Sequence, residues 1–156
     1  MPQHSTRINY RRRPDAYVIG KGEQGVFRVE PYKSELLPYW RFKTPEVAME
    51  SAEALYRCFR HYLEQDDFVG ADMARKYLQM GYTRARRYAR HPGGRKAAHK
   101  SLTSQQENQQ KARSARIFFE RLQWARWDPH YQRLKMQHQQ RRHPGAPSEA
   151  PDAAFS

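Results

Sequence analysis

Asp66 to Arg90 is the stretch D-D-F-V-G-A-D-M-A-R-K-Y-L-Q-M-G-Y-T-R-A-R-R-Y-A-R. Asp66 and Asp67 can accept hydrogen bonds from the first free N–H groups of a helix. Apolar residues then recur at spacings of three and four, the period of an amphipathic helix. They are Ala74, Tyr77, Leu78, Gly81, Ala85 and Tyr88. The sequence therefore predicts one long helix here, ended by Pro92-Gly93-Gly94.

Three more helices are predicted on either side of this one. Thr44-Pro45-Glu46 is a typical helix start, and apolar residues from Ala48 to Leu63 follow it with helical spacing. After the polar segment 101–110, a third helix carries Ala115, Phe118, Leu122 and Ala125. Asp128-Pro129 starts a shorter fourth helix.

The N-terminal side contains a glycine-rich stretch, V-I-G-K-G-E-Q-G-V-F-R-V-E, residues 18–30. Residues 17–19 and 26–29 have the composition of short strands around a loop, and residues 39–42 form a third extended piece. We therefore expect a mainly α protein of the α+β class. A small N-terminal β-hairpin or sheet would pack on a bundle of about four helices.

The glycines also match G-x-G-x-x-G, the pattern of two nucleotide-binding loops. The dinucleotide-binding loop needs a helix after the glycines, but strand-like residues and Pro31 follow here. A protein kinase needs H-R-D and D-F-G motifs and two lobes, which a chain of 156 residues without these motifs does not provide. We expect the glycines to supply positive φ in a hairpin, although their amides beside Lys21 and Arg28 can also hold a phosphate.

Charge is concentrated in the second half of the chain. The formal net charge is +13, and residues 75–100 carry nine Lys and Arg residues and no acid. Such an excess indicates an anionic partner, because arginine forks match phosphate geometry and neutralised phosphates release counterions. The alternative is that these arginines pair with the acidic face of the 45–64 helix or are simply solvated.

We therefore predict a nucleic-acid-binding protein, with DNA favoured over RNA. Tyr82 and Tyr88 interleave with the arginines and can stack on bases. The alternative is that Tyr77 and Tyr88 belong to the core, because both follow the spacing of the apolar residues. The predicted phosphate contacts are Lys76, Arg84, Arg86, Arg87, Arg90, Arg95 and Lys96, with Lys21, Arg28, Lys33, Arg41 and Lys43 as a second positive edge. A protein-interaction module for an acidic partner remains an alternative.

A further alternative is a nucleic-acid-processing enzyme of the repair type. Glu30 and Lys33 lie in a cluster of charged residues and can do acid–base work on a phosphodiester. The competing interpretation is a surface ion-pair cluster. Whether the chain is an enzyme stays open.

Other features narrow the class of protein. The seven scattered histidines and the single Cys58 predict no metal site, no cofactor and no internal disulfide. No apolar run is long enough for a membrane span and no signal peptide is visible, so a cytoplasmic protein is expected. We expect residues 1–13 to form a flexible basic arm, 14–143 a single globular domain, and 144–156 a disordered tail.

Several long runs resemble a domain-of-unknown-function family of bacteria and phages. They are G-K-G-E-Q-G-V, V-E-P-Y-K-S-E, W-R-F-K-T-P, D-M-A-R-K-Y-L-Q-M-G-Y-T-R-A-R-R-Y-A and G-G-R-K. The resemblance covers roughly residues 15–96 and implies no activity, because none is established for the family. It makes the motif residues better site candidates: Glu23, Gln24, Glu30, Lys33, Trp40, Arg41, Lys43, Asp72, Arg75, Lys76, Thr83 and Arg84.

Overall fold

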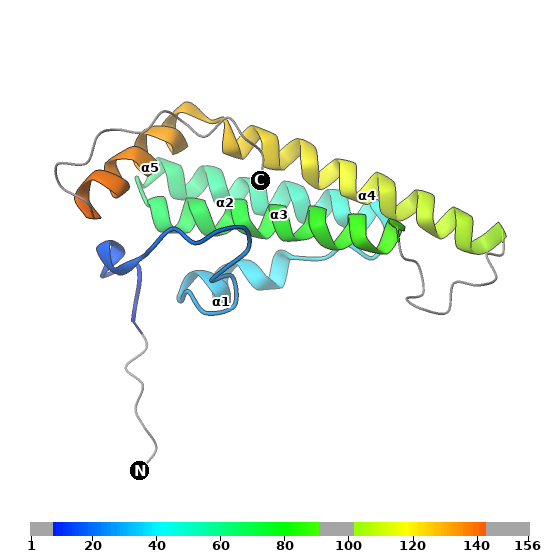
Figure 1. The fold of residues 1–156 in the computed structure, drawn as a ribbon, viewed down its shortest axis with the longest axis horizontal. Coiled ribbons are helices and arrows are strands. Elements are labelled where there is room, and N and C mark those ends of the chain that lie inside the picture. Colours follow the sequence, from blue (N-terminus) through cyan, green and yellow to red (C-terminus); the bar gives the residue numbers. More distant parts are fainter. Residues whose placement is uncertain (1–7, 91–101, 143–156) are drawn as a thin grey trace, which may run out of the picture.

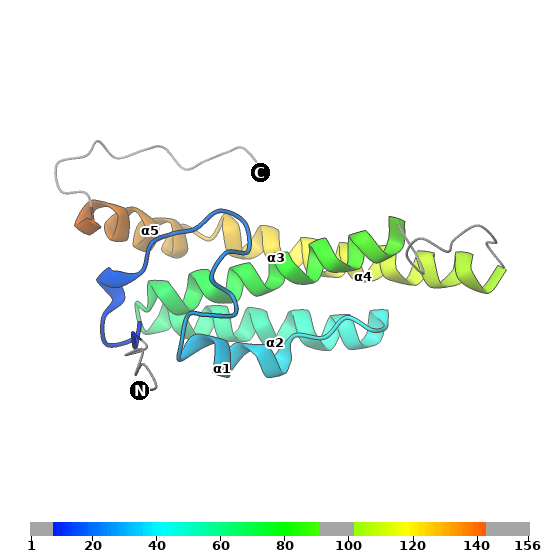
Figure 2. The ribbon, with the colours of Figure 1, turned by 60° about the horizontal axis from the view of Figure 1, so that its bottom comes forward.

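The computed structural model describes residues 8–90 and 102–142. Its elements are η1 (Pro14–Ala16), α1 (Tyr32–Leu36), η2 (Leu37–Tyr39), α2 (Pro45–Glu64), α3 (Phe68–Arg90), α4 (Leu102–Arg126) and α5 (Pro129–Arg142). Helices α2, α3 and α4 run along the long axis and pack against one another (Figure 1). The segment before α1 lies across α3 in both views (Figure 2).

The starts of α2, α3 and α5 follow from local chemistry. Thr44 Oγ1 accepts from Val47 N at 3.1 Å, and Asp67 Oδ1 accepts from Gly70 N at 3.0 Å. Asp128 Oδ1 accepts from His130 N at 2.8 Å. In each case a side-chain oxygen satisfies a backbone donor that the helix itself leaves free. The predicted starts of these helices are confirmed.

Helix α4 begins earlier than the sequence suggested. It starts at Leu102 and includes the polar run that was expected to precede it. Glutamine, glutamate and lysine have high helix propensity, so a polar run of this composition continues a helix readily. The predicted apolar face is correct, because Ala115, Phe118, Leu122 and Ala125 are buried.

The core lies where α3 meets its two long neighbours. Tyr77, Phe59 and Phe118 are fully buried there. Gly81 of α3 lets α4 approach closely, because a Cβ added at this position would lie 2.5 Å from the Phe118 ring. The glycine therefore sets how closely the two helices pack.

The predicted N-terminal β-hairpin or sheet is wrong, since no strand occurs within residues 8–90 or 102–142. Residues 20–30 instead form consecutive tight turns, with Gln24 N donating to Lys21 O at 3.1 Å and Val29 N to Gly25 O at 3.0 Å. Gly22 and Gly25 do have positive φ, +58° and +95°. The chain turns back on itself too often at these glycines to pair two strands.

Carbonyl groups of this segment find their partners on α3. Lys76 Nζ donates to the carbonyls of Gly20 and Gln24 at 3.0 and 2.8 Å, and Tyr77 Oη donates to Val26 O at 2.5 Å. These carbonyls therefore accept from side chains more than 50 positions away in sequence, whereas in a sheet they would accept from the N–H groups of a neighbouring strand. We call residues 20–26 the glycine segment.

Residues 8–13, part of the expected flexible arm, lie against the body. Tyr10 N donates to Glu30 O at 3.0 Å. The Arg11 guanidinium donates to both carboxylate oxygens of Glu35 at 2.7 Å. Residues 1–7 and the tail predicted for 144–156 lie outside the described residues. No helix in the described part of the chain is long and apolar enough to cross a membrane.

Candidate nucleic-acid interface

The cations of α3 divide into an inner pair, Lys76 and Arg75, and a second group of arginines nearer the end of the helix. Lys76 is fully buried, and burial lowers the pKa of its ammonium group while the Asp72 carboxylate opposes that shift. Arg75 Nε donates to Asp72 Oδ1 and to Tyr131 Oη, both at 2.9 Å. The predicted contact of Lys76 with a phosphate is wrong, because its ammonium group is enclosed and donates to carbonyls.

Asp72 is the centre of the buried polar cluster. Its carboxylate accepts from Tyr17 Oη, from Tyr131 Oη at 2.6 Å and from Arg75. Burial alone would raise the pKa of Asp72, but the charges of Arg75 and Lys76 and the two phenols hold it at about 2. The carboxylate is therefore ionised near neutral pH, and both of its oxygens accept hydrogen bonds.

The second group, Arg84, Arg86 and Arg87, lies on the C-terminal part of α3. A helix turns by about 100° per residue, so Arg87 faces away from the buried Ala85, and Arg84 and Arg86 lie on its two sides. Arg86 and Arg87 are exposed, and Arg84 is half-buried. None of these arginines forms an ion pair with an acid among the described residues.

A first groove opens between this part of α3, the segment before α2 and α4. It has a volume of about 530 Å³ and is lined by Arg41, Phe42, Lys43, Val47, Tyr88 and Lys111. Lys111 Nζ donates to the carbonyls of Phe42 and Lys43 at 3.0 and 2.8 Å, which ties the segment to α4. The lining contains three cations and no acid.

Tyr88 is not in the core, where its spacing had suited it. Its residue is 47% exposed, and its ring stacks on Phe42 with a centroid distance of 5.8 Å. By contrast, Tyr77 is fully buried as expected. The helical period placed Tyr88 on the apolar side of α3, but at this end of the bundle that side faces the first groove.

A second groove lies on the opposite side of the same part of α3. It has a volume of about 540 Å³, and its lining includes Tyr82, Arg86 and, from α4, Arg116. Arg86 donates to Tyr82 Oη at 3.1 Å and lies 5.8 Å from the centre of its ring. We call the cations of this region the basic end: Arg41, Lys43, Arg84, Arg86, Arg87, Lys111 and Arg116.

A family model matches residues 2–141 of the chain and carries the description "Domain of unknown function (DUF4385)". The chain belongs to this family. No curated protein and no solved structure matches the chain.

Two sequence motifs of this DUF4385 chain lie against each other in the structure. The motif G-K-G-E-Q-G-V, with Glu23 and Gln24, lies in the glycine segment. The motif D-M-A-R-K-Y-L-Q-M-G-Y-T-R-A-R-R-Y-A, with Asp72, Lys76 and Thr83, belongs to α3. Thr83 Oγ1 donates to Glu23 Oε1, and Lys76 holds the Gln24 carbonyl. Thr83 and Lys76 thus hold the glycine segment against α3, which gives these motif residues a structural role.

The remaining predicted contacts of the DUF4385 chain are placed as follows. Lys21 and Arg28 are exposed on the turns before α1, and neither lines the two grooves. Arg41 and Lys43 line the first groove. The side chain of Arg90 and residues Arg95 and Lys96 lie outside what the structure describes. Lys111 was not predicted, because its partners Phe42 and Lys43 are 68 or 69 positions away in sequence.

Glu30 and Lys33 are not joined in the structure. The Glu30 carboxylate accepts from Ser34 N and Ser34 Oγ at 2.8 Å, so it satisfies a backbone donor in the first turn of the short helix α1. No hydrogen bond or ion pair between the two side chains occurs among the described residues. Their catalytic role stays a prediction. Within residues 8–90 and 102–142, no group of His, Cys, Asp and Glu could bind a metal.

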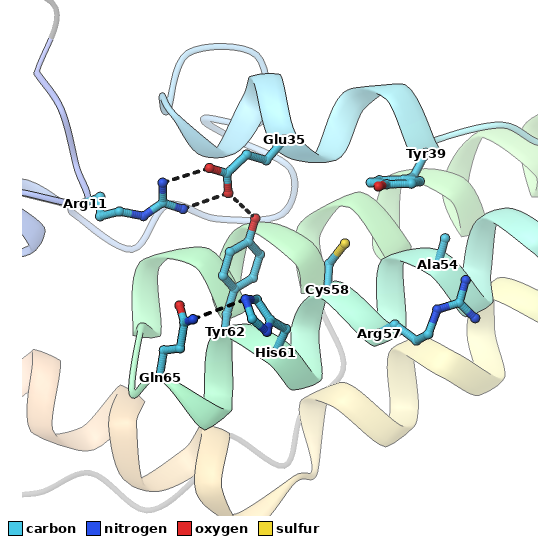
Figure 3. A pocket seen from close by; sticks show the side chains of 9 residues that line it. All are labelled: Arg11, Glu35, Tyr39, Ala54, Arg57, Cys58, His61, Tyr62 and Gln65. Atoms are coloured by element: carbon cyan, nitrogen blue, oxygen red, sulfur yellow. Dashed lines mark hydrogen bonds and ion pairs between the residues drawn. The ribbon is translucent and has the colours of Figure 1, made fainter.

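A larger pocket of about 720 Å³ lies beside α1 and α2 (Figure 3). Glu35 points into it with its carboxylate bonded to Arg11 and to Tyr62 Oη at 2.7 Å, and Arg11 holds the pKa of that carboxyl below its usual range. Burial raises the pKa of the Cys58 thiol. The pocket thus presents a tied carboxylate and a thiol with a raised pKa, together with His61, whose Nε2 lies 3.2 Å from Gln65 Nε2.

Proposed function

We propose that this chain binds nucleic acid through the phosphates at its basic end. The observation that carries the proposal is the first groove, where Arg41, Lys43 and Lys111 meet without a lining acid beside exposed Tyr88. A duplex or single strand offers repeated phosphates at a spacing that several such cations can neutralise together. Arg84 and Arg87 extend the same positive surface along α3.

The basic end differs from the other charged surfaces of the molecule. Arg11, Arg121 and Arg141 each contact a carboxylate, Glu35, Glu53 or Asp15. The cations of the basic end have no such pairs among the described residues. Unpaired arginines keep their full charge for a phosphate, because no internal carboxylate has to be displaced first.

Fluorescence anisotropy with labelled DNA and RNA at several salt concentrations tests the proposal. The triple variant Arg41→Gln, Arg86→Gln, Arg87→Gln removes three charges from the basic end. We expect its log–log salt dependence to be shallower than that of the wild type by about 2–3, since each phosphate contact contributes about 0.9. Its affinity falls accordingly at low salt.

A control of equal charge separates site from bulk charge. Arg12, Arg13 and Arg133 are exposed and come from the N-terminal segment and α5, at the other end of the bundle (Figure 1). Replacing these three by Gln is expected to leave most of the salt slope in place. Equal losses in both triple variants, or no binding at low salt, would overturn the proposal. Binding of an acidic protein that DNA does not displace would support the interaction-module alternative instead.

A further inference from the structure

We propose that the preferred ligand is a single strand, with one base stacked on Tyr88 in the first groove. This inference rests on the proposed function, and it adds what the phosphate contacts leave open. Cations alone do not distinguish a duplex from a single strand. An exposed aromatic face between the cations does, because a single strand offers its base faces and a duplex hides them in its own stack.

Tyr88 ends a row of three aromatic side chains. The ring centroids of Trp40 and Phe42 are 5.1 Å apart, and those of Phe42 and Tyr88 are 5.8 Å apart with 26° between the planes. Trp40 and Phe42 are half-buried and pack against the core, whereas Tyr88 is 47% exposed. The row therefore holds Tyr88 from one side and leaves it accessible from the solvent side.

Cations surround this ring on several sides. Lys111 Nζ lies 6.0 Å from its centre, and Arg41 and Lys43 line the same groove. Arg84 lies one turn earlier on the same side of α3, and Arg87 precedes Tyr88 directly. A base on Tyr88 would thus have arginines and lysines within reach of its flanking phosphates. The groove volume of about 530 Å³ lies within the range of small-molecule sites.

The second groove offers a poorer platform for a base. Its tyrosine, Tyr82, is half-buried, with Phe119 at a centroid distance of 5.1 Å and the Arg86 guanidinium at 5.8 Å. Each of the two rings has one aromatic and one cationic neighbour, since Phe42 and Lys111 lie beside Tyr88 as Phe119 and Arg86 lie beside Tyr82. The two rings differ in exposure: Tyr88 is 47% exposed and Tyr82 is half-buried, so Tyr88 offers a base the larger open ring surface.

Binding of three matched probes to the full chain tests the inference: a thymidine oligomer, a duplex with the same number of phosphates, and an abasic oligomer of the same length. The variants are Tyr88→Leu, which removes the aromatic face, and Tyr88→Phe, which keeps it. We expect Tyr88→Leu to weaken thymidine-oligomer binding about tenfold, within the range measured for one stacked base, and Tyr88→Phe to change it by less than about twofold. The abasic oligomer should bind both variants alike.

The possible results separate this inference from the proposed function. A loss on Tyr88→Leu that is specific to the base-containing single strand supports the inference, and a uridine oligomer run alongside shows which sugar is preferred. Salt-dependent binding of all three probes with no effect of Tyr88→Leu overturns the inference and leaves the proposed function in place. No binding of any probe removes both. Urea unfolding of each variant checks that the change at exposed Tyr88 leaves the fold intact.

Discussion

The ammonium group of Lys76 holds the glycine segment against α3. It donates to the carbonyls of Gly20 and Gln24, and it lies one turn after Asp72, whose charge stabilises it. Burial of an ammonium group is unfavourable, so these acceptors and this carboxylate are what keep it in place. The residue is fully enclosed, so its role is to close the glycine segment onto α3.

Replacing Lys76 with Met should therefore lower stability and leave nucleic-acid binding unchanged. The variant leaves the carbonyls of Gly20 and Gln24 without this donor and removes the positive charge beside the buried Asp72, and we expect the free energy of unfolding to fall by roughly 2–4 kcal/mol. Urea unfolding measures it, with Lys21→Met as the exposed control, expected within about 0.5 kcal/mol of the wild type. The salt slope of nucleic-acid binding should be unchanged at a temperature where the variant is folded. A shallower slope at unchanged stability would restore Lys76 as a phosphate contact.

His138 gives the fold a dependence on pH. It is fully buried, and its Nε2 donates to Tyr17 O at 2.7 Å, while Phe68 and Tyr17 pack on its ring. Burial lowers the pKa of His138, the bond to Tyr17 O opposes this, Arg141 and Arg142 lower it further, and Asp15 raises it. A histidine with a lowered pKa is neutral in the fold, so the unfolded chain takes up the proton first as the pH falls.

Stability should consequently fall as the pH is lowered from about 6.5, the unfolded value, toward the folded pKa of His138. His138→Gln keeps a side-chain N–H donor but does not titrate. We expect the difference in unfolding free energy between pH 7 and pH 5 to be larger in the wild type than in this variant, as measured by urea unfolding. His61 and His130 are present in both proteins and cancel in the comparison. Equal pH dependence would show that His138 is not the titrating group.

At the scale of elements, the contact between α3 and α4 depends on Gly81. A Cβ at this position would meet the buried Phe118 ring at 2.5 Å, so the ring or the helix has to move. Gly81→Ala gains about 1 kcal/mol of helix propensity but loses about 1–3 kcal/mol to overpacking. We expect a net loss of stability by thermal or urea unfolding. In a Phe118→Leu background the same change should cost less, with a coupling of at least about 0.5 kcal/mol. Equal costs in both backgrounds would place the strain elsewhere.

The sequence predicted the elements that depend on local chemistry. Thr44, Asp67 and Asp128 cap their helices by accepting from backbone N–H groups that lie three residues or fewer away in sequence. Each helix start could therefore be recognised without knowledge of the fold. The glycine segment could not be predicted in the same way. Its strand-like composition is real, but the partners of its carbonyls are Lys76 and Tyr77, more than 50 positions away.

The candidate site divides in the same manner. The arginines of α3 and the residues Arg41 and Lys43 stood out by charge alone. Their grouping around Tyr88 depends on Lys111, which reaches across from α4 to the Phe42 carbonyl. Charge therefore identified candidates, and only packing separates buried Lys76 from exposed Arg87 a few turns later.

At the scale of the whole molecule, positive charge and the aromatic platform act at different stages of binding. The net charge of +13 and the unpaired cations of the basic end attract a polyanion from a distance, which affects the association rate. Tyr88 acts only in contact, so its removal affects the dissociation rate. The two contributions should therefore separate in kinetics even though both lower the affinity.

Stopped-flow binding of a labelled single strand measures this separation. For the variant Arg41→Gln, Arg86→Gln, Arg87→Gln we expect a lower association rate whose difference from the wild type shrinks as salt is added, because salt screens the long-range attraction. For Tyr88→Leu we expect an association rate close to wild type and a dissociation rate about tenfold faster. If the arginine variant changed only dissociation, the basic end would not guide encounter. If Tyr88→Leu slowed association instead, its ring would act before contact is complete, and a stacked base would not account for its role.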